Sequence, residues 1–129
     1  MTTARGTFET TSIPQAPYDS ADGVNIGRVS IAKTFAGDIV GSSTVEMIGA
    51  MTSVKGSAGY VAIERVTAAV HGKTGSFVLQ HSGTMKRGEA SLVVSVVPDS
   101  GTGDLVGLEG TMKIDITGGK HFYIFEYSL

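Results

Sequence analysis

Residues 57–85 have the sequence SAGYVAIERVTAAVHGKTGSFVLQHSGTM, in which two apolar runs flank a turn near residues 71–75. Strand-like runs joined by a short glycine-containing turn predict a β-hairpin. The runs carry many polar side chains for a core-like segment, namely Tyr60, Glu64, Gln80 and His81. We therefore expect this hairpin to form the centre of an antiparallel barrel, and its polar residues to be the best candidates for a functional site.

Further strand-like runs flank the hairpin, at residues 5–13, 25–35, 39–48, 90–97, 105–116 and 120–127. With the two hairpin arms they give eight expected strands, and a loop is expected over residues 15–23 because Pro14 ends the first strand. Glycine accounts for 18 of the 129 residues, which suits many tight turns, and no amphipathic helix is apparent. The expected fold class is all-β, an eight-stranded antiparallel and mostly up-and-down barrel, since closure removes strand edges and encloses a ligand-sized interior. A two-sheet sandwich is the alternative that alternation alone does not exclude.

The bulk composition limits the class of protein. A chain of 129 residues suits a single domain over residues 1–129. The net charge is -2 with interspersed charges, which argues against nucleic acid or an anionic membrane as a partner. The chain has no cysteine, so disulfides and thiolate chemistry are excluded. It also lacks an apolar run long enough for a signal peptide or a membrane span, and we expect a cytoplasmic location.

Four motifs occur in order along the chain: GSAGYVAIER at 56–65, TGSFVLQHSGTM at 74–85, VVPDSGTGDLVGLEG at 96–110 and HFYIFEYSL at 121–129. Together they resemble the bacterial domain-of-unknown-function 3224 family over nearly the whole chain. That family is similar to the allene oxide cyclase barrel, an eight-stranded antiparallel β-barrel, so the resemblance implies a barrel rather than a sandwich. Allene oxide cyclases isomerise a reactive lipid epoxide inside the barrel, and the resemblance makes a related activity one hypothesis by analogy of fold.

The central hairpin brings a carboxylate and an imidazole together. With a turn centred near residues 72–73, Glu64 lies opposite His81, and a register shifted by one residue places Gln80 opposite Glu64 instead. A carboxylate beside an imidazole raises the pKa of the histidine and lowers its own, a pairing suited to proton transfer. A Glu64 buried alone would have a raised pKa and could act as a base. The structural alternative is a satisfied polar pair in the barrel wall or on its outer face.

Other polar residues in the neighbouring strands extend this candidate site. If Glu46 shares a face with Tyr60 and Glu64, the interior holds two carboxylates and a phenol, which can divide acid and base roles. Lys33 lies on the strand next to Glu46 and could neutralise a carboxylate. The candidate catalytic residues are thus Glu64, His81, Glu46 and Tyr60, and the candidate ligand-binding residues are Lys33, Gln80 and Tyr60.

Two other motifs have simpler explanations. The glycines of residues 101–110 fail the spacing of a phosphate-binding loop and precede a strand, so a turn and a bulge explain them better. The three histidines show no metal-binding spacing, and we expect His71 and His121 at the surface. No metal and no cofactor are expected.

The function stays open between three hypotheses. A barrel that binds a small, largely apolar molecule is favoured, because no strong catalytic signature is present. An isomerase or cyclase acting on a small hydrophobic substrate in the same cavity is the second, and a filled barrel with a structural or interaction role is the third. Whether the protein is an enzyme is therefore undecided. Residues 90–97 and 121–127 are apolar on both faces, which favours a homodimer.

Overall fold

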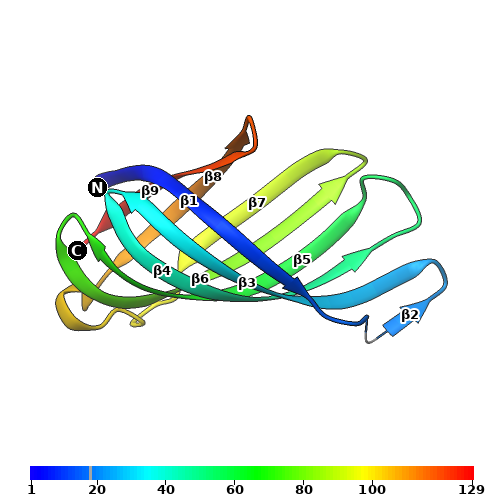
Figure 1. The fold of residues 1–129 in the computed structure, drawn as a ribbon, viewed down its shortest axis with the longest axis horizontal. Coiled ribbons are helices and arrows are strands. Elements are labelled where there is room, and N and C mark those ends of the chain that lie inside the picture. Colours follow the sequence, from blue (N-terminus) through cyan, green and yellow to red (C-terminus); the bar gives the residue numbers. More distant parts are fainter. Residues whose placement is uncertain (18) are drawn as a thin grey trace.

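The chain forms a closed antiparallel barrel. The computed structural model describes residues 1–17 and 19–129, and in these ranges eight strands close the barrel, each pairing with its neighbours. They are β1 (Thr2–Pro14), β3 (Val24–Gly37), β4 (Ile39–Met51), β5 (Ala58–Val70), β6 (Lys73–Lys86), β7 (Glu89–Val96), β8 (Glu109–Thr117) and β9 (Lys120–Ser128). Strand β1 closes the ring because it pairs with both β3 and β9 (Figure 1). The predicted barrel is confirmed, and the sandwich alternative is wrong.

Two segments differ from the sequence prediction. Within the expected loop over 15–23, a short strand β2 (Asp19–Ala21) pairs with the start of β3. The strand expected from residue 105 begins only at Glu109, because a single 3-10 turn (Gly103–Leu105) comes first and buries Leu105. Gly101 allows this close approach, since a Cβ atom there would collide with the Leu105 carbonyl oxygen. No helix among the described residues has the length and apolarity to cross a bilayer.

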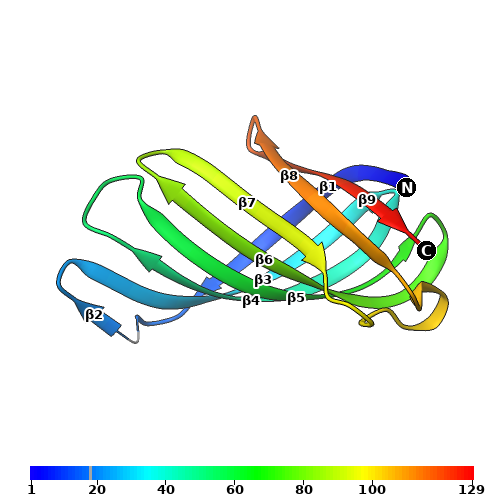
Figure 2. The same ribbon diagram turned by 180° about the vertical axis from the view of Figure 1, so that it is seen from behind.

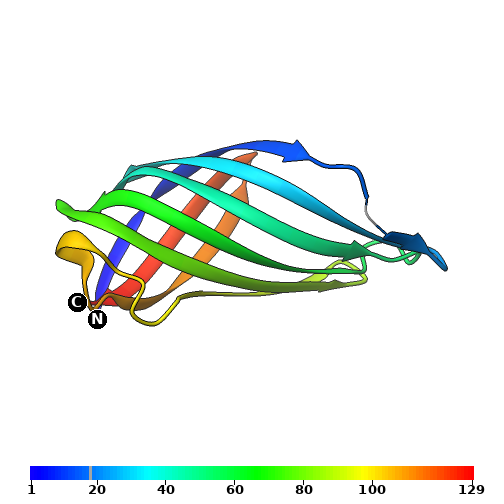
Figure 3. The same ribbon diagram turned by 90° about the horizontal axis from the view of Figure 1, so that it is seen from below.

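Along its axis the barrel has a filled half and an open half. Both termini lie at one end, where the 97–108 connection folds over the opening (Figures 1 and 3). Side chains from every barrel strand fill this closed end, and Phe77 stacks on Phe125 with ring centroids 5.8 Å apart. The core therefore occupies one half of the barrel only, and the candidate site lies beyond it.

The register of the central hairpin differs from the prediction by two residues. Its turn is formed by His71 and Gly72, which have φ angles of 47° and 80° as a two-residue type I′ turn requires. Glu64 consequently lies opposite Leu79, and His81 lies opposite Ala62. Both predicted registers, with His81 or Gln80 directly opposite Glu64, are wrong, whereas the predicted hydrogen-bonding contact between Glu64 and His81 is confirmed. Because the error is an even number of residues, Glu64 and His81 still share the inner face as diagonal neighbours.

The barrel wall is weakest between β7 and β8. In the described part of these strands only two pairs join them, Val94↔Met112 and Ser95↔Thr111. Away from the termini the two strands diverge (Figure 2). The open half of the barrel is thus bordered by two strand segments that lack a neighbour on one side.

Candidate functional site

A cavity of about 870 Å³ occupies the barrel half that faces away from the termini. Its mouth is bordered by the β4–β5 connection, residues 52–57, and the β6–β7 turn. Two hydrogen bonds join these loops: the Gly88 amide donates to the Gly56 carbonyl oxygen at 3.0 Å, and the Arg87 amide donates to the Ser57 side-chain Oγ at 3.0 Å. The joined loops give the cavity a defined opening.

The cavity walls are mainly apolar. Near the mouth, Met51 and Ile116 are 68% and 64% exposed although both line the cavity. Large exposed apolar side chains beside a cavity favour an apolar occupant, because that occupant would remove them from water. The remaining apolar lining includes Ile31, Val45, Met47, Ala58, Ala62, Met85, Leu92 and Ile114.

The floor of the cavity, which we define as Lys33, His81 and the Glu64 beneath them, is a buried charged cluster. Glu64 is fully buried, and its Oε1 accepts hydrogen bonds from His81 Nε2 at 2.7 Å and from Lys33 Nζ at 3.1 Å. Its Oε2 accepts a hydrogen bond from Ser43 Oγ at 2.5 Å. Lys33 and His81 line the cavity, so the carboxylate acts on the space above through these two side chains.

The electrostatics of the floor follow from its partners. Burial alone would raise the pKa of Glu64, because a carboxylate loses its hydration there. The hydrogen bonds from His81 and Ser43 and the charge of Lys33 outweigh that effect, so the pKa of Glu64 lies below its ordinary value. Glu64 is therefore an ionised, fully paired group at neutral pH. Glu64 orients Lys33 and His81. It is not an isolated buried carboxylate with a raised pKa, which was one of the possibilities considered from the sequence.

Tyr60 stands above the floor and lines the cavity. Its ring covers Gly83, its cross-strand partner, where a Cβ atom would approach the ring carbon Cε1 to 2.6 Å. Burial raises the pKa of Tyr60, so its hydroxyl stays protonated at neutral pH. Within the described residues this hydroxyl makes no hydrogen bond, which leaves it available to an occupant of the cavity.

His121 was expected at the surface, and that prediction is wrong. The first inward position of β9 places it half-buried in the cavity wall, with its ring centroid 5.0 Å from that of Phe8. Lys33 Nζ lies over the other aromatic ring of this pair, 4.5 Å from the Phe8 ring centroid. The sequence signal that could have identified His121 is its alternation with Tyr123 and Phe125, which face the core.

Two predicted site residues point away from the cavity. Glu46 lies on the outer face of β4, where its side chain is 59% exposed and pairs with Arg28 at 3.6 Å. Its carboxylate also accepts a hydrogen bond from Ser30 Oγ at 3.0 Å. Gln80 is likewise exposed on the outer face of β6. The hypothesis of two carboxylates sharing the interior is wrong, because strand alternation directs the Glu46 side chain outward.

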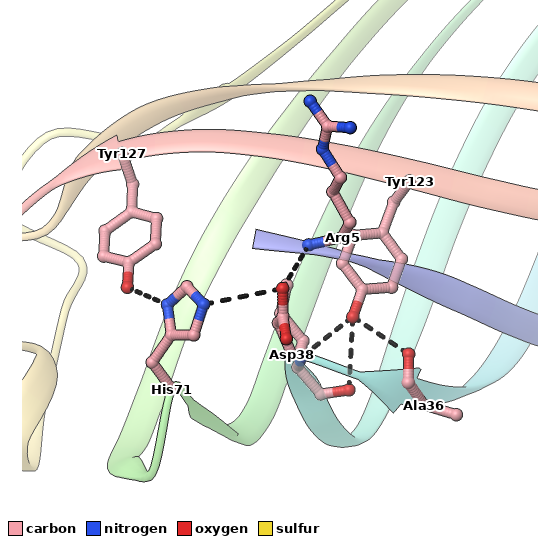
Figure 4. A network of polar contacts seen from close by, with 7 residues as sticks. Arg5, Ala36, Asp38, His71, Tyr123 and Tyr127 are labelled. Atoms are coloured by element: carbon pink, nitrogen blue, oxygen red, sulfur yellow. Dashed lines mark hydrogen bonds and ion pairs between the residues drawn. The ribbon is translucent and has the colours of Figure 1, made fainter. Parts of the chain in front are cut away.

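A second polar network lies at the closed end (Figure 4). His71 Nδ1 lies 2.5 Å from the Tyr127 hydroxyl, and His71 Nε2 lies 3.5 Å from Asp38 Oδ2. The same carboxylate oxygen accepts a hydrogen bond from the Arg5 backbone amide at 2.8 Å. The network thus joins the β3–β4 turn and the β5–β6 turn to the first and last strands.

Tyr123 completes this network. Its hydroxyl donates to the Ala36 carbonyl oxygen at 2.9 Å and accepts from the Ile39 amide at 2.8 Å (Figure 4). Burial raises the pKa of both Tyr123 and Tyr127, so neither is a phenolate at neutral pH. We assign this network to closure of the barrel end, because it satisfies turn backbone groups beside the filled core.

The described residues contain no group of three or more histidine, aspartate or glutamate side chains placed to hold a metal ion. Every buried side-chain nitrogen and oxygen in this part of the chain has a hydrogen-bond partner. The groups left open to an occupant are therefore those that face the cavity.

Comparison with known proteins identifies relatives without assigning an activity. The family model described as "Protein of unknown function (DUF3224)" matches residues 4–127. A crystal structure of a protein with unknown function from the DUF3224 family, from Shewanella oneidensis MR-1, superposes with a TM-score of 0.95 and 48% sequence identity. That match covers 100% of this chain and 98% of the other. No curated protein matches the chain significantly.

Proposed function

The chain belongs to the DUF3224 family, and we propose that it binds a small, largely apolar molecule in the open half of its barrel. The observation that carries the proposal is the cavity of about 870 Å³, whose apolar walls end on the polar floor. Ligand sites commonly have volumes of roughly 300–1,000 Å³, with a few polar groups that orient the ligand. The apolar body of the ligand would contact the walls, and one polar group would reach Lys33 and His81.

The distribution of side chains supports binding over a purely structural barrel. Aromatic and aliphatic side chains fill the closed end, while the opposite half keeps open space between apolar walls. A barrel without a ligand would gain stability from filling this half as well, because packing to normal interior density contributes dispersion energy.

A series of methyl ketones of increasing chain length tests the proposal. Burial of one CH₂ group contributes about 0.8 kcal/mol, so two added groups should tighten binding by about 1.6 kcal/mol, or roughly fifteenfold in Kd. We expect this increment from methyl butyl to methyl hexyl to methyl octyl ketone, measured by isothermal titration calorimetry. An affinity that does not rise with chain length would contradict an apolar site inside the barrel.

A matched pair of variants locates the binding site. Ala58 lies between Met51 and Met85 in the strand register, and all three line the cavity near its mouth. Ala58→Phe should narrow the entrance and weaken binding of methyl octyl ketone at least about tenfold. Ala32→Phe adds the same ring on the exposed outer face of β3 and should leave the affinity unchanged. Equal effects of the two variants would place the ligand elsewhere.

An isomerase or cyclase in the same cavity, as the allene oxide cyclase-like hypothesis suggests, is the second candidate. The observation that favours it is the hydrogen bond between Glu64 and His81 on the cavity floor. A carboxylate that fixes one imidazole nitrogen leaves the other oriented as a base, which is the arrangement of many proton-transfer sites.

A further inference from the structure

The floor of the cavity presents one imidazole nitrogen to the open space. Because the Glu64 carboxylate can only accept, His81 Nε2 carries the hydrogen of their 2.7 Å bond. His81 Nδ1 forms no hydrogen bond with any described residue, and every buried polar side-chain atom in that part of the chain has a partner. Nδ1 is therefore not sealed in the protein interior, and in the neutral ring it holds a lone pair beside the cavity that His81 lines.

Lys33 supplies a hydrogen-bond donor to the same space. One of its three N–H groups is used on Glu64 Oε1, and the ammonium lies 4.5 Å from the ring centroid of Phe8. Its other two N–H groups form no hydrogen bond with any described residue, and Lys33 lines the cavity. Lys33 and His81 are bonded to the same carboxylate oxygen, so one small polar group can reach both.

The charge balance of the floor selects the kind of polar group. Lys33 and the ionised Glu64 form a neutral pair with side chains that are 7% and 0% exposed. A neutral ligand keeps that balance, whereas a carboxylate ligand would add an uncompensated negative charge in a poorly hydrated site. A carbonyl oxygen fits best, because it is neutral and accepts a hydrogen bond from Lys33.

We propose that the protein catalyses proton transfer at the carbon next to the carbonyl group of a neutral, apolar ketone or aldehyde, with His81 as the base and Lys33 as the electrophile. This inference rests on the proposed binding function and assigns the chemical class of its ligand. The reaction needs only the carbonyl compound and a solvent proton, and His81, Lys33 and Glu64 are regenerated in each cycle.

The step balances without any co-reactant. His81 Nδ1 takes the α-proton, the C–H bonding pair becomes the C=C bond of an enolate, and the carbonyl π pair moves to the oxygen. Lys33 stabilises the developing charge on that oxygen by donating a hydrogen bond, and Glu64 stabilises the imidazolium that forms. The proton on Nδ1 is replaced by one from solvent, and delivery of that solvent proton to the same carbon completes the exchange. In an unsaturated ketone, delivery of the proton to a conjugated carbon gives an isomerised product. The protonated Tyr60 hydroxyl provides a neutral hydrogen-bond donor to the cavity in addition to the Lys33 ammonium.

Deuterium exchange measured by proton NMR tests this proposal. Methyl octyl ketone is incubated with the protein in D₂O, and loss of its α-proton signals is compared with that in buffer containing the same concentration of free imidazole. We expect saturable acceleration by the protein and competitive suppression by decane, which fills the cavity without a carbonyl. His81→Gln keeps an N–H donor for Glu64 but has no base, and should reduce the exchange rate about 10²–10⁴-fold.

The controls separate this proposal from the binding proposal. Glu46→Gln removes an outer-face carboxylate and should leave the exchange rate unchanged, while calorimetry with His81→Gln should still detect the ketone. Binding without acceleration over imidazole would overturn proton transfer and leave the binding function standing. Absence of binding to the wild-type protein would overturn both. Full exchange activity in a folded His81→Gln protein, or no suppression by decane, would overturn the assignment to this cavity.

Discussion

Glu64→Gln should strongly destabilise the protein, because it removes the partner of a buried lysine. Lys33 and Glu64 are joined by a 3.1 Å contact with side chains 7% and 0% exposed, so the remaining ammonium would be an uncompensated buried charge. Breaking such a pair costs about 3–5 kcal/mol. A domain of this size has a total unfolding free energy of about 5–15 kcal/mol. The variant should therefore still fold at neutral pH, with a much smaller free energy of unfolding than the wild type.

The double variant Lys33→Met with Glu64→Gln is the matched control. It removes both charges together, so no buried charge is left without a partner. We expect it to be more stable than Glu64→Gln alone in urea denaturation followed by far-UV circular dichroism. A double variant as unstable as the single variant would refute the charge argument.

The same urea denaturation, repeated at acidic pH, gives a second test of the charge argument. Because the pKa of Glu64 is lowered in the folded state, its ionised form stabilises the protein above the ordinary value of 4.5. That stabilisation is lost as the pH falls below this value and through the lower folded-state pKa. The stability gap between the wild type and Glu64→Gln should therefore narrow in acid. A constant gap would show that the gap does not come from the charge of Glu64.

Three further predictions concern other parts of the barrel. Tyr127→Phe removes the hydroxyl that is hydrogen-bonded to His71. It should lower the unfolding free energy by about 0.5–1.5 kcal/mol without changing the affinity for the ketone. A loss of ketone affinity in calorimetry would contradict the assignment of this network to barrel closure. Gly83→Ala should cost about 1–3 kcal/mol in urea denaturation, because the new Cβ meets the ring of Tyr60 at 2.6 Å. Gly59→Ala, whose Cβ has its nearest neighbour at 3.8 Å, should change stability by less than about 1 kcal/mol, and equal losses would count against this packing argument. The homodimer expected from the sequence stays a prediction. The outward-facing Val61 and Val93 lie in one row across β5, β6 and β7, and are 57% and 60% exposed. Sedimentation velocity should show a wild-type dimer that Val61→Lys dissociates, and a monomeric wild type would exclude the dimer.

The sequence predicted the barrel and two of its central polar residues because alternation with a period of two residues is a local property. Alternation placed Glu64 and His81 on one shared face of the hairpin but left open whether that face is the inner one, and the structure buries both. The register could not be predicted as well, because it depends on His71 adopting a positive φ in the turn. A histidine is a less obvious residue for that conformation than asparagine or glycine.

The error for Glu46 has a different cause. Its strand has polar residues on both faces, with Ser43 inward and Thr44 and Glu46 outward, so composition does not identify the inner face. Ser43 lies inward and donates a hydrogen bond to Glu64, and this contact depends on the registers of β3, β4 and β5, in which Lys33 lies opposite Ser43. The cavity itself could not be predicted from the sequence, because its volume depends on how eight strands close around side chains of different sizes.

The methionine methyl groups provide the most direct test of a ligand site in the open half of the barrel. The chain has five methionines; Met47, Met51 and Met85 line the cavity, Met112 lies in the core, and Met1 is exposed at the terminus. Titration of ¹³C-methyl-methionine protein with methyl octyl ketone, followed by NMR, should shift the three cavity resonances saturably with one common Kd and leave that of Met1 in place. Cavity resonances that stay fixed up to the solubility limit of the ketone would contradict the proposed site.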